Sequence, residues 1–443
     1  MAQNDRETTV NSALARWPSP WQAWYTVALL GLLYIISWVD RNILVLLAQP
    51  VSQALGLDDR QMALLLGLGF ALLYAIGGVL LGHFVDTRNR RTVATCGIIL
   101  WSTATVLSAF ATSFWSMLLL RCGVALGEAV LMPAAISLIA DLFPRERRGL
   151  PVAVFTSIGG VMTIGSYAGG AAAIGIAGSI NGVVGLSVWQ TTLIIVGLPG
   201  FALALIFALS ATVPARTASD AGSAREDGLG AVFAHFRSRL HFLGPLLSLT
   251  GITCIFSLAI IIWLPAVLIR EHGITASQAG YLIAIVGVPT GLASNFFWQW
   301  CATRLQRRDP QRGILRTFIA PALLVAPCYA AGLLTNSLPL QLTGFATGLF
   351  MSTAFNVLTQ IAIQYYTPPQ MRARMVSVNF LIISVLGYGF GPLAAVEIAP
   401  LLVAGVSGLR MGLFALTLVT WPLLVIAMLA AVRNADGPAE HEQ

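Results

Sequence analysis

The sequence has few charged residues and no lysine. Only 10% of its 443 residues are charged, and the 25 basic residues in that total are all arginines. Soluble domains carry about 25% charged residues, so a chain that is 57% hydrophobic does not read as a soluble enzyme. The composition predicts an integral membrane protein. The net charge of +7 does not indicate nucleic-acid binding, because the arginines lie in short clusters between apolar runs.

Residues that bind metals or carry out nucleophilic catalysis are also scarce. The five cysteines all fall inside apolar runs and show neither a disulfide framework nor metal-ligand spacing. The sequence contains no recognisable Ser/His/Asp set, metal cluster or phosphate-binding loop. It therefore predicts no enzyme activity, no cofactor and no metal site.

Apolar runs long enough to cross a bilayer occur twelve times. They lie at 24–47, 61–83, 92–112, 115–142, 150–174, 190–211, 242–269, 276–302, 313–334, 338–366, 373–399 and 408–432. Arginine-rich connections follow the second, fourth, eighth and tenth runs. The positive-inside rule then predicts that both termini are cytoplasmic. The arginine bias and the absence of long loops favour a bacterial inner membrane.

The one long polar segment predicts how these runs are divided. Residues 212–241 are small, polar and charged, as expected for a cytoplasmic linker. The prediction is an all-α integral membrane protein with two pseudo-symmetric six-helix bundles. The first covers 1–211, and the second covers 242–443 with a short cytoplasmic tail.

A short internal repeat supports two related halves. Pro144-x3-Arg148 follows the fourth run, and Pro368-x3-Arg372 follows the tenth, an offset of 224 residues. Parallel six-helix halves are typical of transporters that work by rocking one half against the other.

The fourth run carries two charges inside an otherwise apolar stretch, Arg121 and Glu128. At about 1.5 Å per residue, Glu128 lies ~20 Å from Trp115, near the depth of a bilayer midplane. The two side chains are two helical turns apart and share a face. Charges at this depth are costly unless they are paired or face water, so a polar pathway is predicted.

The first run carries Asp40 and Arg41. Counted from the ends of their runs, Asp40 and Arg121 have similar depths, which predicts an ion pair between them. Arg41, about 100° round the helix, should face another neighbour or the cavity. Glu128 has no evident cation at its own depth, and burial disfavours its charged form, so we expect it to exchange a proton. The alternative for Asp40 and Arg121 is a static ion pair that fixes one helix against the other. The alternative for Glu128 is an ordinary interhelical hydrogen bond.

Residues 82–91, GHFVDTRNRR, follow the second run. They resemble the loop signature of the major facilitator superfamily, with Thr87 and Asn89 in place of its usual Arg and Gly. The resemblance implies a charge network that latches the cytoplasmic side of the protein. Its members would be Asp86, Arg90, Asp141 and Arg145.

The charged residues of the first and fourth runs resemble a particular branch of that superfamily, the spinster (SPNS) lysolipid and sphingolipid transporters. The matching segments are Asp40-Arg41, Arg121, Gly127-Glu128-Ala129, Pro133 and the stretch 139–143, IADLF. The proton-coupled symporters of sugar acids, sialin-like proteins included, share the same four charges. Both resemblances imply that Arg41 and Arg121 bind an anion, and that Asp40 and Glu128 couple protons.

The second half offers amides rather than charges to a shared cavity. Asn356, Gln360 and Asn379 are candidate substrate ligands, although such residues also join helices by hydrogen bonds. A mostly neutral half favours an amphipathic anion, such as a lysophospholipid or sphingolipid, carried by a proton-coupled transporter. The alternatives are a symporter of small organic anions and a non-transporting membrane sensor. The expected partners are the substrate, protons and membrane lipids, and we expect a monomer.

Overall fold

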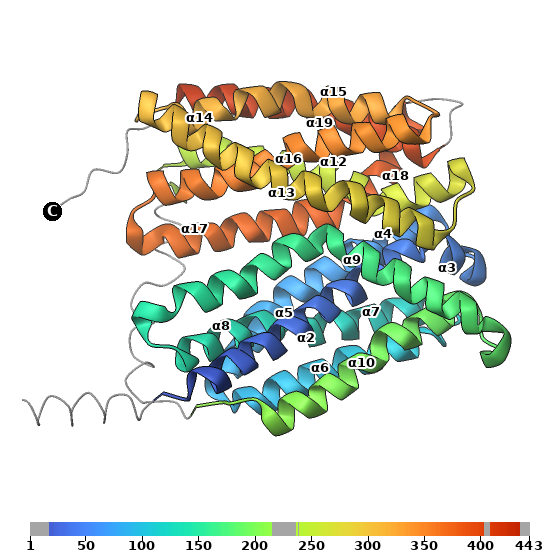
Figure 1. Ribbon diagram of the computed structural model, residues 1–443. Helices are drawn as coiled ribbons and strands as arrows, with labels where there is room; N and C mark the ends of the chain where they lie inside the picture. Colours follow the sequence, from blue (N-terminus) through green and yellow to red (C-terminus); the bar gives the residue numbers. More distant parts are fainter. Residues whose placement is uncertain (1–16, 215–235, 238, 403–407, 435–443) are drawn as a thin grey trace, which may run out of the picture. The chain divides into compact units, whose positions relative to one another are not determined.

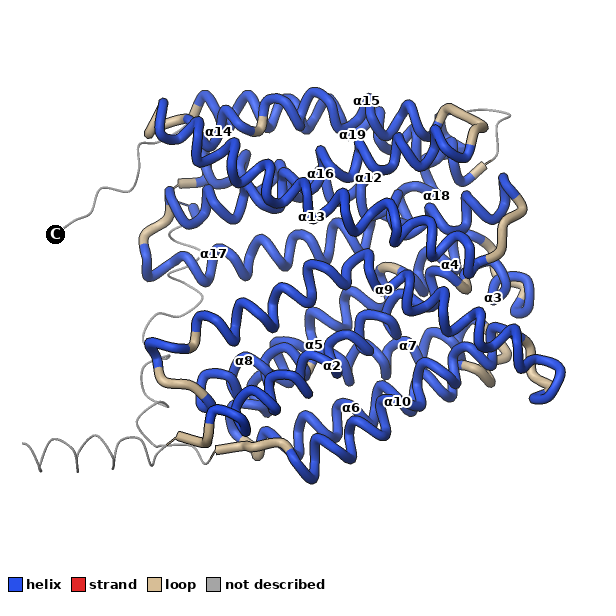
Figure 2. The backbone as a smooth tube through the Cα atoms, viewed as in Figure 1, coloured by secondary structure: helices blue, strands red, loops and turns tan. Residues whose placement is uncertain are grey.

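The computed structural model describes residues 17–214, 236–237, 239–402 and 408–434. Helices and short connections account for all of these residues, and no strand occurs among them (Figure 2). The predicted all-α fold is confirmed. Most of the predicted linker 212–241 lies outside the described residues.

The helices follow the predicted apolar runs (Figure 1). In the first half they are α2 (Pro20–Leu46), α3 (Ala48–Leu55), α4 (Asp59–Leu66), α5 (Leu68–Thr87), α6 (Arg90–Ser108), α7 (Phe114–Ala129), α8 (Leu131–Leu142), the 3-10 turn η1 (Arg145–Arg147), α9 (Gly149–Val184) and α10 (Val188–Ser210). In the second half they are α12 (Leu240–His272), α13 (Ala276–Arg308), α14 (Gly313–Thr317), α15 (Ile319–Leu333), α16 (Leu338–Tyr366), α17 (Pro369–Ile382), the π-helix η3 (Ile383–Phe390), α18 (Gly391–Leu402) and α19 (Leu409–Arg433).

Among the described residues, 11 helical segments are long and apolar enough to cross a membrane. The remaining predicted run, 92–112, is occupied by α6, which is less apolar because it begins with Arg90 and Arg91 and contains several hydroxyl residues. Three of these hydroxyl residues, Ser102, Thr105 and Ser108, are buried, and α6 packs against α7 and α10. Hydroxyl groups on the face that packs against other helices are tolerated because they need not meet lipid. The twelve-helix arrangement is confirmed.

The internal repeat extends from sequence to local structure. In each half an arginine Nε donates to the carbonyl just before the repeated proline: Arg148 to Phe143 O at 2.9 Å, and Arg372 to Thr367 O at 3.1 Å. The two prolines have nearly the same backbone angles, with φ −56° and ψ 151° at Pro144 and φ −55° and ψ 146° at Pro368. The repeat therefore marks the same turn in both halves.

By packing, the chain forms two compact units. Unit 1 comprises the described residues of Met1–Ile43 and Leu73–Ser223, and unit 2 comprises those of Leu44–Leu72 and Ala224–Gln443. The segment 44–72, which holds α3 and α4, thus packs with the helices of the second half although it lies between two helices of the first. The predicted bundle boundaries at 211 and 242 assumed that neighbours in sequence stay together, and this segment is the exception.

Candidate functional site

Four charged residues come together inside unit 1. Asp40 and Arg41 lie on α2, and Arg121 and Glu128 lie on α7. Asp40, Arg121 and Glu128 are 1%, 4% and 1% exposed, and the Arg41 side chain is 14% exposed. Two acids and two arginines have no net formal charge, which is the condition under which buried charges are tolerated.

The ion pair in this cluster joins Arg41 to Glu128. Arg41 Nη2 lies 2.8 Å and Arg41 Nε 3.1 Å from the same oxygen, Glu128 Oε2. The other oxygen, Oε1, is buried and has no hydrogen-bond partner among the described residues. The expectation that Glu128 lacks a cation at its depth was wrong. It treated each charge as lying at the depth of its Cα, whereas an arginine side chain reaches across more than one helical turn.

Two aromatic rings flank the Arg41 guanidinium. Its Cζ lies 4.9 Å from the ring centre of Trp38 and 4.4 Å from that of Tyr74, on α5. Cations are attracted to the faces of aromatic rings, and a planar guanidinium also packs well on them. The rings therefore hold Arg41 in a fixed orientation towards Glu128.

Asp40 is held from a third helix. Thr105 Oγ1, on α6, lies 2.7 Å from Asp40 Oδ1 and 2.6 Å from Oδ2. Arg121 Nη2 donates to the backbone carbonyl of Arg41 at 3.3 Å, so it reaches the turn of α2 that carries both charges. The Asp40–Arg121 ion pair itself stays a prediction.

Two glycines explain how α6 and α7 come close enough for this arrangement. A Cβ on Gly127 would lie 2.6 Å from the carbonyl oxygen of Gly97, and a Cβ on Gly97 would lie 2.9 Å from that of Gly127. Any side chain at either position would force the helices apart. Glu128, next to Gly127, is thereby placed at the tightest part of the helix contact.

The candidate ligands of the second half lie in unit 2 and differ in exposure. Asn356 is exposed and Gln360 partly exposed, one turn apart on α16. Asn379, on α17, is fully buried, and neither amide atom has a hydrogen-bond partner among the described residues. A buried amide without partners is costly, so Asn379 is not explained as a bond between helices in this structure.

Two of the four predicted gating residues form an ion pair. Arg90 Nη2 contacts Asp141 Oδ2, and Arg90 Nη1 also donates to the carbonyl and hydroxyl oxygens of Ser137 at 3.0 Å each. Arg90 is 3% exposed, and this contact ties the start of α6 to α8. The side chains of Asp86 and Arg145 lie outside the described residues.

Thr105, Trp38 and Tyr74 were not predicted as part of the site. Trp38 lies two residues before Asp40, and Thr105 lies on α6, whose predicted span drew no attention because it has no charge in its interior. A search for hydroxyl residues on the helices between the charged ones could have found Thr105. Nothing in the sequence alone joins Tyr74 to Arg41.

A comparison with known protein families shows which family the chain belongs to. A profile described as Major Facilitator Superfamily matches residues 30–392, which is well over half of the chain. The chain belongs to the major facilitator superfamily. This member is a transporter of a small molecule and not an enzyme.

Several relatives resemble this major facilitator protein. An "MFS-type efflux pump" of Mycolicibacterium smegmatis is 26% identical over 374 residues, which is 84% of this chain and 83% of the relative. A "Probable L-galactonate transporter" of Escherichia coli is 26% identical over 62% of each chain. The mouse "Sphingosine-1-phosphate transporter SPNS2" is 32% identical over 130 residues, 29% of this chain and 24% of that protein.

Among solved structures, a bacterial homologue of the human lysosomal transporter Spinster, in an inward-facing conformation, has a TM-score of 0.78 to this chain. The two are 24% identical, and the match covers 95% of this chain and 100% of the other. The predicted resemblance to spinster proteins is confirmed, and the shared fold is that of the superfamily.

Proposed function

We propose that this chain is a proton-coupled secondary transporter of an amphipathic anion, such as a lysophospholipid or a sphingolipid, and that it works by alternating access. The observation that supports this most is the Arg41–Glu128 ion pair. A cation suited to an anionic head group is occupied by a carboxylate that can take up a proton.

The coupling follows from competition for one arginine. With Glu128 charged, its Oε2 occupies Arg41, and an incoming anion must displace it. A proton on the unpartnered Oε1 neutralises Glu128 and weakens its hold on Arg41. The anion then binds Arg41, with Arg121 as the second cation. Binding of the proton and of the anion favour each other, as coupling between two sites requires.

The remaining predicted residues take supporting roles in this proposal. Asp40, held by Thr105, is the second proton-coupling acid. Asn356, Gln360 and Asn379 contact the neutral part of the substrate. Asp86, Arg90, Asp141 and Arg145 latch the cytoplasmic side. The transporter acts as a monomer in a bacterial inner membrane, with both termini in the cytoplasm.

A symporter of small organic anions is the second candidate. It is favoured by the similarity to galactonate transporters of Escherichia coli, one of which matches 83% of this chain at 26% identity. The charged cluster suits either head group, so the substrate's apolar tail is what separates the two candidates.

Ligand-induced thermal stabilisation of the detergent-purified protein tests the substrate class. Wild type and Arg41→Ala would be compared with two sets of ligands, lysophosphatidate or sphingosine phosphate against galactonate. We expect stabilisation by the lipids in wild type and its loss in Arg41→Ala. Stabilisation by galactonate alone would establish the second candidate instead.

Arg304→Ala is the matched control. Arg304 also lies over an aromatic ring, with its Cζ 5.4 Å from the centre of Trp300, but on α13 in unit 2. It should keep the full response to the lipids. Stabilisation by lipid in all three proteins would mean detergent-like binding, and the assignment of the head group to Arg41 would be wrong.

Proton coupling is tested by Glu128→Gln in proteoliposomes with an imposed pH gradient. Glutamine imitates the protonated acid, so we expect substrate binding to persist and accumulation driven by the gradient to stop. Glu397→Gln, which removes an exposed carboxylate paired with Arg60, should leave accumulation unchanged. Continued accumulation in Glu128→Gln would remove the proton from the proposal.

A further inference from the structure

The π-helix η3 lies between α17 and α18, and the spacing of the backbone hydrogen bonds changes within it. At its start the N–H of Ile383 donates to Asn379 O and Phe380 O, four and three residues earlier. At its end the N–H of Gly391 donates to Leu386 O, five residues earlier. The widened turn thus takes up one residue more than a regular α-helix would. Such π turns are rare in proteins, and those that occur often lie at functional sites.

Pro392 explains why the helix widens at this place. In a regular α-helix the N–H of residue 392 would donate to Tyr388 O, but proline has no N–H and its ring collides with that carbonyl group. A local π turn is one of the ways in which membrane helices accommodate a proline. A residue with an N–H at position 392 should therefore favour a regular helix.

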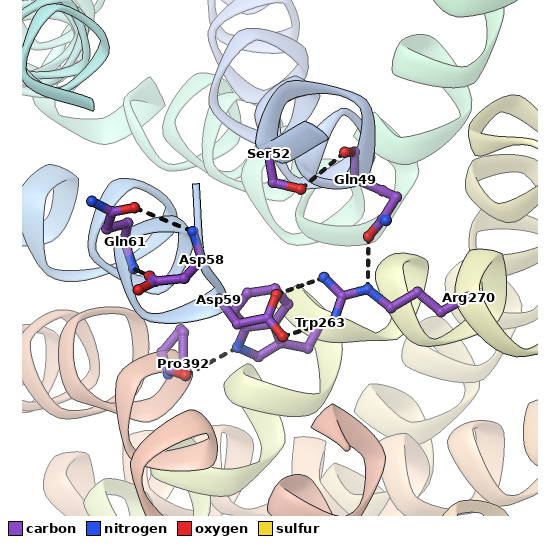
Figure 3. A network of polar contacts seen from close by, with 8 residues as sticks. All are labelled: Gln49, Ser52, Asp58, Asp59, Gln61, Trp263, Arg270 and Pro392. Carbon is purple, nitrogen blue, oxygen red and sulfur yellow. Dashed lines mark hydrogen bonds and ion pairs between the residues drawn. The ribbon is translucent and has the colours of Figure 1, made fainter. Parts of the chain in front are cut away.

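The α18 side of η3 is anchored to α12 through its backbone. The buried Trp263 donates its indole N–H to Pro392 O at 3.0 Å (Figure 3). A Cβ on Gly391 would lie 2.5 Å from Ile255 O, so only glycine permits this close approach. We therefore expect α18 to keep its place if the hydrogen bonding in η3 changes.

Before these anchors, the chain meets α12 through flexible side chains instead. A Cβ on Gly251 of α12 would lie 3.0 Å from Ile382 Cγ2, at the end of α17, and 3.2 Å from Leu386 Cδ1, in η3. The ends of such side chains can change rotamer as a helix turns. A change of hydrogen bonding in η3 should therefore turn α17 while α18 stays fixed.

The present register of α17 places a polar residue inside and an apolar residue outside. Asn379 is fully buried, and neither atom of its amide has a hydrogen-bond partner among the described residues. The next residue, Phe380, is 59% exposed. A buried amide without partners costs free energy, and burial of an apolar side chain is favourable. An exchange of the two positions would therefore stabilise the other register.

A regular helix through η3 would make this exchange. With α18 fixed, each residue of α17 would move to the position now held by the residue before it, because the widened turn no longer takes up a residue. Phe380 would take the buried position of Asn379, and Asn379 would take the half-buried position of Val378. Met375, the buried residue one turn earlier, would likewise give way to Val376. The buried stripe of α17 would then be apolar at both positions.

We propose that η3 is a register switch. As a π-helix it keeps Asn379 buried, and as a regular α-helix it turns the Asn379 amide to the half-buried position now held by Val378. The consequence for transport rests on the proposed function, in which Asn379 is a ligand of the substrate. The switch makes this amide available in only one of two states, and a substrate that bonds to it favours that state.

The test measures a distance within unit 2 of the full-length protein, with no substrate added. Spin labels would be attached through unnatural amino acids at Leu381 on α17 and Thr303 on α13, both exposed, so that the native cysteines stay. One residue of register turns α17 by about 100°, which moves the Leu381 label by up to about 8 Å on a helix of this diameter. We expect Pro392→Ala to raise the share of this second distance about ten-fold or more, because it restores the N–H that a regular helix needs.

Two further changes, each added to Pro392→Ala, test the cause. Asn379→Leu removes the unpartnered amide and should lower the share of the second distance about five-fold or more. Deletion of Ser384 removes one residue from η3, so a regular helix then leaves α17 in its present orientation and the second distance should disappear. Pro327→Ala, within the regular helix α15, is the matched control and should leave the distances unchanged.

The proposal is overturned if Pro392→Ala gives the wild-type distances, if the Ser384 deletion leaves the second distance in place, or if Asn379→Leu does not lower its share. Pro392→Gly restores the same N–H and repeats the measurement should the alanine variant not fold. Because no substrate is present, these outcomes do not depend on the head-group test at Arg41, and failure of that test would leave the distances as they are.

Discussion

The segments α7–α8 and α16 occupy equivalent positions in the internal repeat, but their buried side chains differ. Each covers 29 residues, Phe114–Leu142 and Leu338–Tyr366, and their starts lie 224 residues apart. At this offset Arg121 corresponds to Phe345 and Glu128 to Ser352, both buried. Ser352 meets the Tyr329 hydroxyl at 3.1 Å, where Glu128 meets an arginine.

The two helices also differ in how regular they are. The first helix is broken at Val130, and the second is continuous. Pro133 explains the break, because proline lacks an N–H and its ring collides with the carbonyl four residues earlier, that of Ala129. The corresponding residue of α16 is Val357. The half with the charged site thus has the interrupted helix, and the neutral half has the regular one.

The largest effect should come from Glu128→Ala compared with Ser352→Ala. Removing one partner of a buried ion pair costs about 3–5 kcal/mol, since the remaining charge loses its carboxylate. Losing the Ser352 hydroxyl should cost about 1 kcal/mol. The measurement is the free energy of unfolding in mixed micelles. Equal losses at both sites would mean that the Arg41–Glu128 pair contributes nothing particular to the first half.

The next effect concerns the broken helix. Val357→Pro should interrupt α16 and cost about 3 kcal/mol, while Pro133→Ala, in a backbone already adapted to the break, should change stability by less than about 1 kcal/mol. Unfolding in the same micelles measures both. If α16 tolerates proline as well as α7–α8 does, the difference between the two helices does not depend on Pro133.

A smaller effect is expected at Thr105→Val, which removes the hydroxyl that donates to Asp40. Hydrogen bonds to charged groups contribute about 1.5–3 kcal/mol. Thr420→Val is the control: its buried hydroxyl donates at 2.7 Å to Leu416 O of its own helix, so its loss should cost less. A larger loss at Thr420 than at Thr105 in the unfolding measurement would contradict the role given to Thr105.

The smallest effect should be that of Tyr329→Phe in the second half. Its hydroxyl meets Ser352, which also donates to Leu349 O at 3.2 Å, so we expect a loss of about 0.5–1.5 kcal/mol. The half-buried Tyr365, whose hydroxyl donates to Pro310 O at 2.8 Å, supplies the control, and Tyr365→Phe should stay within about 0.5 kcal/mol. A loss as large as that of Glu128→Ala would show that the neutral cluster matters as much as the charged one.

Much of the fold could be predicted because membrane helices obey simple constraints of length and polarity. The twelve runs, the two halves and the repeated Pro-x3-Arg turn all followed from residue order. The packing of segment 44–72 with the second half could not be predicted. It includes contacts of Gln49 and Asp59 with Arg270, a residue more than 200 positions away in the sequence.

The candidate site, too, could be predicted only in part. The sequence by itself determined which residues are costly in a bilayer, namely Asp40, Arg41, Arg121 and Glu128, because a buried charge stands out in any apolar run. Only the tertiary structure decided that Arg41, rather than another cation, meets Glu128. Partner choice depends on the rotation of each helix, the reach of its side chains and the close approach that Gly97 and Gly127 permit, and none of these is set by residue order alone.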